Sequence, residues 1–310
     1  MISELPMGRG AVDAMGYERA SFTFADLNGQ PWVGHVVDPA GRVLIRNGRL
    51  AEVMDGAGEP LLLGRTTDGI VHLVWVVPTE PNTPGTANFV ANVPRSSGTD
   101  LAPSLALAEA TLVPLTQIAA ELSADDSQLA SRAVALAKWH ATFRFCPRCG
   151  APVVPVEAGW ASQCTNCGAI EYPRMDPVVI MRVTDAKERL LLASNATWPE
   201  RRMSLPAGYV EAGETPPQAV DRELWEEVQL RVENTEYLAS QVWPGPRSLM
   251  LAFSATIRGG TADPVPDGVE IREARFFSKR ELIRAFDTGD VLGPGPSSIA
   301  YAVINDWLGA

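Results

Sequence analysis

Four cysteines within one short stretch constrain the fold of this chain more than any other feature. They form two Cys-x-x-Cys pairs, Cys146 with Cys149 and Cys164 with Cys167, and 14 residues separate the pairs. A glycine follows each pair, so the backbone can turn tightly past the second sulfur. Four thiolates can then converge tetrahedrally on one Zn²⁺. The alternatives are a thioredoxin-type redox pair, which needs only one motif, and four buried thiols.

A closed site of four thiolates leaves no position for a water molecule, so the predicted zinc is structural rather than catalytic. No cysteine remains elsewhere in the chain to form a disulfide, which is typical of a reducing compartment. No apolar run approaches the ~18 to 20 residues of a membrane span, and the first residues lack the pattern of a signal peptide. We therefore expect a cytoplasmic protein that does not enter a membrane.

The overall charge narrows the function further. The 310 residues include 26 Lys and Arg against 37 Asp and Glu, a net charge of −11. Proteins that coat nucleic acid neutralise phosphates with clustered basic residues, so this class is excluded. With 46% hydrophobic and 20% charged residues, the composition is that of a globular protein, for which this length favours two domains.

The residues before the cysteines predict a small sheet followed by helices. Apolar runs rich in Val and Ile indicate strands at 32–37, 41–46 and 71–77. The segment 78–103, rich in Pro, Gly, Ser and Thr, is expected to be a loop, and helical spacing follows at 104–122 and 126–143. We find no catalytic constellation in this half of the chain.

The segment 205–230 contains a helix with explicit start signals. Thr215 can cap the helix, Pro216 suits its first position, and Gln218 completes a capping box. Glu223, Glu226 and Glu227 then stand at i, i+3 and i+4 and fall on one arc of the helix, beside an apolar stripe of Val220, Leu224 and Val228.

Three carboxylates on one face repel one another, and Arg222 at i−4 from Glu226 offsets only part of that repulsion. A bound cation would offset the rest. Oxygen ligands select Mg²⁺ or Mn²⁺, and Mg²⁺ commonly bridges carboxylates to substrate phosphates. The alternative is an ordinary solvated acidic face, which any Glu-x-x-Glu-Glu taken alone would favour.

The same segment resembles the Nudix box, Gly-x5-Glu-x7-Arg-Glu-U-x-Glu-Glu-x-Gly-U with U an aliphatic residue. The matching positions are Gly208, Glu214, Arg222, Glu223, Leu224, Glu226, Glu227 and Leu230. One position departs, because Gln229 stands where the box has a glycine. That glycine normally adopts a left-handed conformation after the helix, so the substitution predicts about 1 to 2 kcal/mol of local strain.

The zinc ribbon narrows the resemblance to the NADH pyrophosphatases, the NudC-type branch of the Nudix hydrolases, over the full length of the chain. The run Ser240-Gln-Val-Trp-Pro-Gly-Pro-Arg-Ser248 is similar to the branch's Ser-Gln-Pro-Trp-Pro-Phe-Pro-x-Ser signature of NAD(H) recognition. Val242 replaces a proline and Gly245 replaces the phenylalanine.

The resemblance implies an α/β fold of three parts. These are a smaller Nudix-like α+β domain at 1–143, a zinc ribbon at 144–174 and a catalytic Nudix α/β/α sandwich at 175–310. Within the last part we expect strands at 178–183, 189–193, 236–242, 248–257 and 273–277, and two helices at 216–228 and 297–307.

The resemblance also implies site residues. For the catalytic Mg²⁺ or Mn²⁺ they are the carbonyl of Ala207 and the carboxylates of Glu223, Glu226, Glu227 and Glu273, with Arg222 orienting the carboxylates and Glu226 or Glu227 as the base. For the dinucleotide they are Tyr172, Tyr209, Gln241, Trp243, Pro244, Pro246, Ser248 and Ala300. On the sequence alone, Trp243 and Tyr172 are equally compatible with core packing.

The implied reaction is hydrolysis of the pyrophosphate of NAD(H) to NMN(H) and AMP by a homodimer. The sequence does not distinguish whether NAD caps on RNA 5′ ends are also removed. Two alternatives remain: a Nudix hydrolase of another dinucleoside pyrophosphate, which Val242 and Gly245 permit, and a zinc-ribbon nucleic-acid adaptor with an inactive Nudix fold, which the net charge of −11 disfavours.

Overall fold

The computed structural model describes residues 2, 5–54, 56, 58–78 and 110–309. It contains two compact units. One unit comprises residues 7–174 together with 244–247, and the other comprises 1–6, 175–243 and 248–310. We call them the N-terminal unit and the C-terminal unit. No helix within the described ranges is long and apolar enough to span a membrane.

The N-terminal unit is built on a mixed sheet. Its strands are β1 (Trp32–Val37), β2 (Arg42–Arg46), β3 (Arg49–Leu50), β4 (Leu61–Arg65), β5 (Val71–Val76) and β6 (Thr111–Pro114). They run in the order β3-β2-β1-β5-β4, with β6 paired to β2. The pair β1 and β5 is parallel, and the other pairs are antiparallel. A short helix η1 (Phe24–Leu27) precedes the sheet, and α1 (Leu115–Ile118) and α2 (Ala124–Thr142) follow it.

The ribbon follows α2 within the same unit. It is a three-stranded antiparallel sheet of β7 (Val153–Val156), β8 (Ala161–Cys164) and β9 (Ile170–Glu171), with the short helix η4 (Glu157–Gly159) between β7 and β8. Trp160 ties it to the first sheet, because its indole N–H donates to the carbonyl of Leu62 at 2.7 Å.

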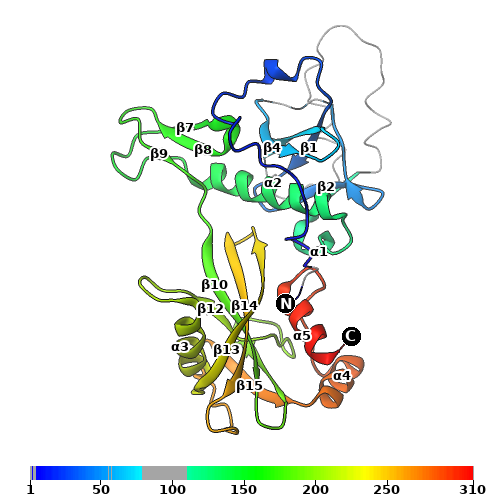
Figure 1. Cartoon of the computed structure of the whole chain (residues 1–310), viewed down its shortest axis with the longest axis vertical. Helices are drawn as coiled ribbons and strands as arrows, with labels where there is room; N and C mark the ends of the chain where they lie inside the picture. The colour runs from blue at the N-terminus through cyan, green and yellow to red at the C-terminus, as the bar shows by residue number, and fades with distance from the viewer. Residues whose placement is uncertain (1, 3–4, 55, 57, 79–109, 310) are drawn as a thin grey trace. The chain divides into compact units, whose positions relative to one another are not determined.

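The C-terminal unit is a second mixed sheet between helices (Figure 1). Its strands are β10 (Asp176–Thr184), β11 (Leu190–Asn195), β12 (Ala207–Tyr209), β13 (Val232–Trp243), β14 (Ser248–Ile257) and β15 (Ile271–Phe277). They run in the order β13-β14-β10-β11-β15, with β12 on β10. The helix α3 (Pro216–Val228) covers one face, and α4 (Lys279–Thr288) and α5 (Ile299–Leu308) cover the other.

The architecture confirms the predicted α/β class, with a Nudix α/β/α sandwich, a zinc ribbon and an N-terminal mixed-sheet domain. Two expectations for the helices are wrong. Residues 111–114 of the expected helix at 104–122 form strand β6, because they pair with β2, and residues 104–109 lie outside the described ranges. The C-terminal unit has α4 in addition to the two helices expected. The predicted loop at 78–103 lies, beyond Pro78, outside the described residues.

Candidate active site and metal centres

The four cysteines come together as predicted. Their sulfur atoms all lie within 4.8 Å of one another, and the closest distances are 3.5 Å between Cys149 and Cys164 and 3.7 Å between Cys146 and Cys167. Two turns of the same form present them. In each turn the glycine is left-handed, with φ of 72° and 70°, and its N–H donates to the carbonyl of the first cysteine, at 2.9 and 3.2 Å. This is the geometry of a closed four-thiolate zinc site.

Helix α3 begins and ends as its local sequence predicts. The side-chain oxygen of Gln218 accepts from the backbone N–H of Thr215 at 2.8 Å, and the helix starts at Pro216. At the other end Gln229 adopts φ 55° and ψ 32°. The N–H of Gln229 donates to the carbonyl of Trp225 at 3.0 Å and the N–H of Leu230 to that of Leu224 at 3.2 Å, so the left-handed turn satisfies carbonyls of the last helical turn. Gln229 thus takes the left-handed conformation usually reserved for glycine.

The three helix carboxylates differ sharply in environment. Glu227 is 5% exposed, and it lies beside the apolar stripe that packs on the sheet. The side chain of Glu223 is 14% exposed and that of Glu226 is 60% exposed. Along the helix, the carboxylate of Glu223 is therefore partly buried, that of Glu226 is solvated and that of Glu227 is buried.

Arg222 uses all its hydrogen-bonding capacity to hold this arrangement. It makes a bidentate pair with Glu214, at 2.8 and 2.9 Å. It also donates to Glu223 at 2.9 Å, to Glu226 at 3.0 Å and to the carbonyl of Tyr209 at 2.8 Å. These contacts occupy the five N–H donors of a guanidinium. Arg222 therefore fixes two carboxylates of the helix against the strand β12.

The proton affinity of Glu227 is raised by its position in the site. Burial raises the pKa of Glu227 to about 8, and the negative charge of Glu223 adds to the rise. Its Oε2 atom is buried and has no hydrogen-bond partner among the residues that the structure describes. Burying a carboxylate without a partner is costly, so this oxygen calls for a proton or a cation.

Burial also raises the pKa of Glu223, against the opposing effect of Arg222. Strand β12 passes close to this side chain at Gly208. A Cβ atom added at Gly208 would lie 1.9 Å from the carboxyl carbon of Glu223, so no other residue fits there without a shift. The glycine lets the backbone of β12 approach Glu223, and the carbonyl of Tyr209 on the same strand accepts from Arg222.

Comparison with known proteins agrees with both the carboxylate-bearing helix and the four-cysteine ribbon. The family model described as NUDIX domain matches residues 173–292, and the one described as NADH pyrophosphatase zinc ribbon domain matches residues 141–172. The NAD-capped RNA hydrolase NudC of Mycobacterium tuberculosis (strain ATCC 25618 / H37Rv) is 37% identical, covering 94% of this chain and 93% of that protein. The chain belongs to the NudC-type NADH pyrophosphatase family.

Two further relatives match a shorter part of the chain. NudC of Salmonella schwarzengrund is 37% identical over 58% of this chain and 65% of that protein. The mitochondrial NAD(P)H pyrophosphatase NUDT13 of Mus musculus is 35% identical over 64% of this chain and 59% of that protein. The resemblance drawn from the Nudix box and the ribbon is thereby confirmed.

The fourth acidic residue assigned from the NudC-type pattern, Glu273, is not brought to the helix carboxylates. It lies on β15 with Arg275, whose Nε is 3.5 Å from its carboxylate, and Arg275 in turn lies over the ring of Phe277. Phe277 belongs to the core on the α4 and α5 side of the sheet. Glu273 therefore lies on the face opposite α3.

Glu270, just before β15, is an acidic residue that the sequence analysis did not single out and whose charge acts on the helix carboxylates. Its charge raises the pKa of both Glu223 and Glu227. Asp267 positions this segment, since its backbone N–H donates to the carbonyl of Glu227 at 3.0 Å and its carboxylate accepts from the N–H of Glu270 at 3.1 Å. In the sequence, Glu270 stands three residues before Glu273, and only the face of the strand on which each side chain lies distinguishes the two.

The residues expected to recognise a dinucleotide divide between the two units. Tyr209 is 53% exposed beside the carboxylates. Gln241, Ser248 and Ala300 are buried, and Trp243 is partly buried. The remaining three, Tyr172, Pro244 and Pro246, belong to the N-terminal unit.

Gln241 is the most informative of these residues. Its side-chain N–H donates to the carbonyl of Ser297 at 3.0 Å, while its Oε1 is buried and meets no hydrogen-bond partner within the described ranges. Buried amide oxygens are rarely left unsatisfied, so this atom is consistent with a ligand contact. At Gly245, φ is not left-handed and an added Cβ meets no atom within 4 Å, so the missing aromatic of the signature could stand there without strain.

Proposed function

We propose that this chain hydrolyses the pyrophosphate bond of NAD(H), giving NMN(H) and AMP, and that it removes NAD caps from RNA. The buried oxygen of Glu227, which has no partner among the described residues, carries the proposal. A buried carboxylate with a purely structural role would be paired with a donor, whereas a metal-ligating carboxylate has the metal as its partner. The relative that matches nearly the whole chain is named an NAD-capped RNA hydrolase, and another is named an NAD(P)H pyrophosphatase.

The carboxylates of Glu223 and Glu227 are the donors that we assign to a divalent cation. The charge of Glu270 raises the pKa of both, and Gly208 lets the strand β12, which carries Ala207, pass close to Glu223. Such an all-oxygen donor set suits Mg²⁺ or Mn²⁺. When bound, the metal supplies charge stabilisation at phosphate and lowers the pKa of water.

The chain's own residues then have distinct tasks. Arg222, held by Glu214, keeps Glu223 and Glu226 in place. Glu227 or Glu226 accepts the proton of the attacking water. The exposed ring of Tyr209 offers a stacking surface for a base.

The proposal is tested with Glu227→Gln. A neutral amide is a poorer metal ligand and no base, so turnover of NADH with Mg²⁺ or Mn²⁺ should fall at least about a hundredfold while the fold persists. Glu236→Gln, an exposed carboxylate of β13, is the matched control and should retain full turnover. Production of NMNH and AMP is followed by chromatography. Near-normal hydrolysis by Glu227→Gln would contradict the assignment.

Substrate choice is tested separately. A panel of NADH, NAD⁺, ADP-ribose and NAD-capped RNA distinguishes the proposed activity from a Nudix hydrolase of another pyrophosphate. Preference for ADP-ribose, which lacks nicotinamide, would still support a Nudix hydrolase but would contradict the assignment of NAD(H) as its substrate. No metal-dependent turnover of any of the four would favour the adaptor alternative.

A further inference from the structure

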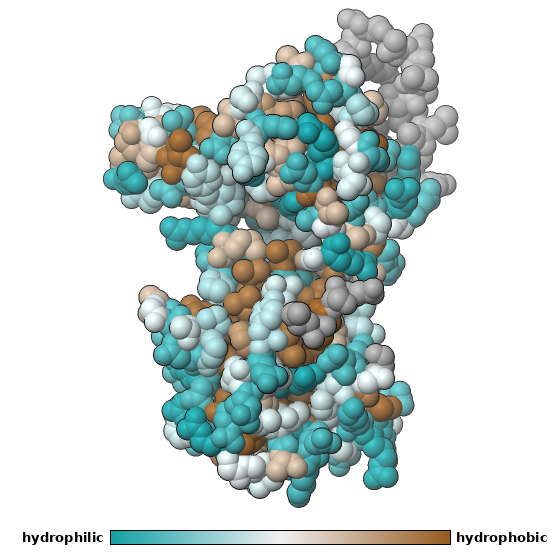
Figure 2. Space-filling view, viewed as in Figure 1, coloured by the Kyte–Doolittle hydropathy of each residue, from teal (hydrophilic) through white to brown (hydrophobic). Residues whose placement is uncertain are grey.

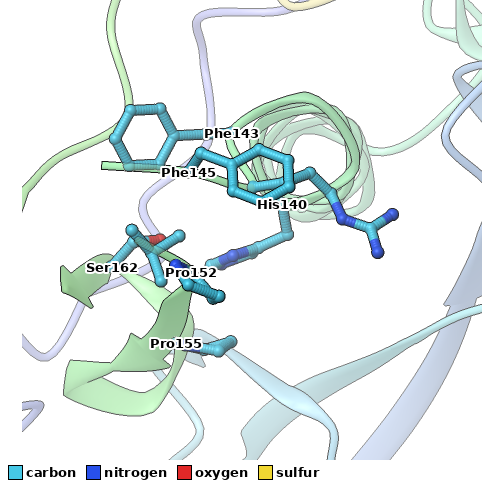
Figure 3. Close-up of a pocket in the computed structure, with 8 residues that line it drawn as sticks. His140, Phe143, Phe145, Pro152, Pro155 and Ser162 are labelled. Carbon is cyan, nitrogen blue, oxygen red and sulfur yellow. The ribbon is translucent and has the colours of Figure 1, made fainter. Parts of the chain in front are cut away.

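A cavity of about 320 Å³ lies where α2 passes into the zinc ribbon, outside the residues used above. It is lined by His140 at the end of α2, by Phe143, Arg144 and Phe145 just before the first cysteine, and by Pro152, Val153, Pro155 and Ser162 from the ribbon. All of them belong to the N-terminal unit. Figure 3 shows the two phenylalanine rings on one side of His140 and the two prolines on the other.

The aromatic part of the lining is suited to a flat ligand. Phe143 is fixed by stacking on Trp139, with ring centroids 4.1 Å apart and planes 12° apart. Phe145 is 64% exposed, although a phenylalanine gains most by burial. Apolar residues also surface elsewhere on the ribbon, which lies at the left of the N-terminal unit in Figure 2. An exposed ring beside a cavity provides a stacking surface rather than core packing.

The polar part of the lining offers one acceptor and one donor. His140 Nε2 lies 2.7 Å from the carbonyl of Gly159. Because a carbonyl can only accept, Nε2 carries the hydrogen, and burial lowers the pKa of His140, so Nδ1 is left as an acceptor. The hydroxyl of the buried Ser162 accepts from the indole N–H of Trp139 at 3.2 Å, which leaves its own hydrogen to donate.

The cavity lining is basic. Arg144 contributes a guanidinium, and no acidic residue lines the cavity although the whole chain carries a net charge of −11. Single-stranded RNA is recognised by stacking its bases on aromatic rings, by hydrogen bonds to base edges and by basic groups on its phosphates. A stacking surface, an acceptor, a donor and a cation around one small cavity fit the parts of one nucleotide.

We propose that this cavity binds one nucleobase of single-stranded RNA, with the base on Phe145, its edge on His140 and Ser162, and its phosphate on Arg144. The inference rests on the proposed function, in that the RNA is the body of the NAD-capped substrate. It assigns to the ribbon a second task besides binding zinc. A pyrophosphatase that acts only on free NADH would not need such a site.

The first experiment uses an uncapped, labelled, single-stranded oligoribonucleotide and fluorescence anisotropy, so it does not depend on catalysis. Phe145→Ala should weaken binding at least about fivefold, the loss of one base stack, and Arg144→Ala should weaken it and reduce its salt dependence. The matched controls are Ile170→Ala, also exposed on the ribbon, and Arg148→Ala. Zinc content and melting temperature confirm that each variant is folded.

The second experiment compares KM for an NAD-capped oligoribonucleotide with KM for NADH. Phe145→Ala should raise the first by the same factor as it weakens binding and leave the second unchanged. Equal binding by wild type and Phe145→Ala, an equal loss in Ile170→Ala, or a parallel rise in KM for NADH would each overturn the inference. If the wild type hydrolyses neither substrate, the proposed function fails, and the binding experiment still decides about the cavity.

Discussion

The two units of the chain are built on sheets of closely similar topology, but among the described residues a helix that carries three carboxylates on one face is found in the C-terminal unit alone. Each sheet has a central parallel pair, β1 with β5 and β10 with β14. A short hairpin joins the first strand of each pair to an antiparallel neighbour, through Val37 opposite Val43 in one unit and Thr184 opposite Leu190 in the other. A late strand, β6 or β15, then pairs with that neighbour and leads into two helices.

The two hairpins share a side-chain device that supports the correspondence. Asp38 accepts from the backbone N–H of Arg42 at 2.9 Å and from its Nε at 2.6 Å. Asp185 accepts from the same two groups of Arg189 at 2.9 and 2.8 Å. Both aspartates are buried. The repeat is visible in the topology and in these contacts, although no repeat is evident from the sequence.

The two units differ in the length of chain that follows β12 in one and Val53 in the other. In the C-terminal unit residues 210–231, including α3, separate β12 from β13, whereas only residues 54–60 separate Val53 from β4. The sheet of the N-terminal unit has a face that corresponds to the one α3 covers. When the two sheets are aligned on their parallel strand pairs, Trp75 stands at the position of Ala255 on that face. Catalytic potential in this architecture therefore comes from one inserted segment that carries Arg222 and the carboxylates.

Trp75 does part of the packing that α3 does in the other unit. Cβ atoms added at Gly34 and Gly56 would lie 2.1 and 2.3 Å from its ring, so both glycines make room for it. Trp75→Ala should lower the free energy of unfolding by about 3 to 5 kcal/mol, as for other buried aromatic residues, and leave NADH turnover per folded molecule unchanged. Denaturant unfolding and kinetics measure the two effects.

The matched variant is Leu224→Ala on the buried face of α3. It should cost about 2 to 5 kcal/mol and also lower turnover, because it loosens the helix that carries the carboxylates. If Trp75→Ala cost less than about 1 kcal/mol, well below the range for a buried aromatic, Trp75 would not be the counterpart of the helix.

The second difference is a pair of histidines in the N-terminal unit. His35 Nε2 lies 2.9 Å from His72 Nδ1, and the outer nitrogens face the carbonyl of Ala51 and the hydroxyl of Thr66, at 3.0 and 3.1 Å. The register places Ala252 of the C-terminal unit at the position of His72. Burial lowers the pKa of His35 from 6.5 to about 4 and also lowers that of His72.

Because the unfolded chain binds these protons more readily, the N-terminal unit should lose stability as pH falls from 6.5 toward 4, by about 3 kcal/mol for His35. The stability is fully present above pH 6.5. The charged groups that raise the pKa of His72 and moderate its shift are Asp68, Asp126, Glu52 and Asp125. Unfolding measured across this range should show the loss, and His35→Gln, which cannot titrate, should flatten it. An unchanged slope in that variant would rule out His35 as its source.

The shared hairpin predicts equal effects in the two units. Asp38→Asn and Asp185→Asn each replace a buried carboxylate that accepts from an arginine only about one-third exposed. Each should cost about 1 to 3 kcal/mol, the range for a lost charge-assisted bond at a buried group. Thermal unfolding with limited proteolysis identifies which unit opens first. A clear inequality between the two variants would break the correspondence at this hairpin.

Sequence reasoning succeeded where the signals were local. The bounds of α3 follow from Thr215, Pro216 and Gln218, and the zinc site from the spacing of the cysteines. The same kind of signal existed for α4, where Glu281 accepts from the N–H of Ser278 at 2.8 Å, but its sequence, half of it charged, was not recognised as helical.

Sequence reasoning failed where distant segments decide the structure. Residues 111–114 are a strand only because β2 offers them a partner. The burial of Glu227 and the approach of Glu270 depend on a loop whose Asp267 binds the end of α3. Helical periodicity places three acids on one arc, but it does not tell which of them is buried.

The smallest expected effect concerns how the helices of the C-terminal unit end. Helices α4 and α5 end in left-handed glycines, Gly289 with φ 72° and Gly309 with φ 83°, whereas α3 ends in Gln229 with φ 55°. Gln229→Gly should raise stability by about 1 kcal/mol by removing left-handed strain, and leave turnover unchanged because the carboxylates precede it. Gly289→Gln, where an added Cβ meets no atom within 4 Å, should lose a similar amount. Melting temperatures of this pair should therefore move in opposite directions. If Gln229→Gly is neutral or destabilising, contacts of the glutamine side chain outweigh the backbone strain, and the departure from the box glycine would have a structural cause of its own.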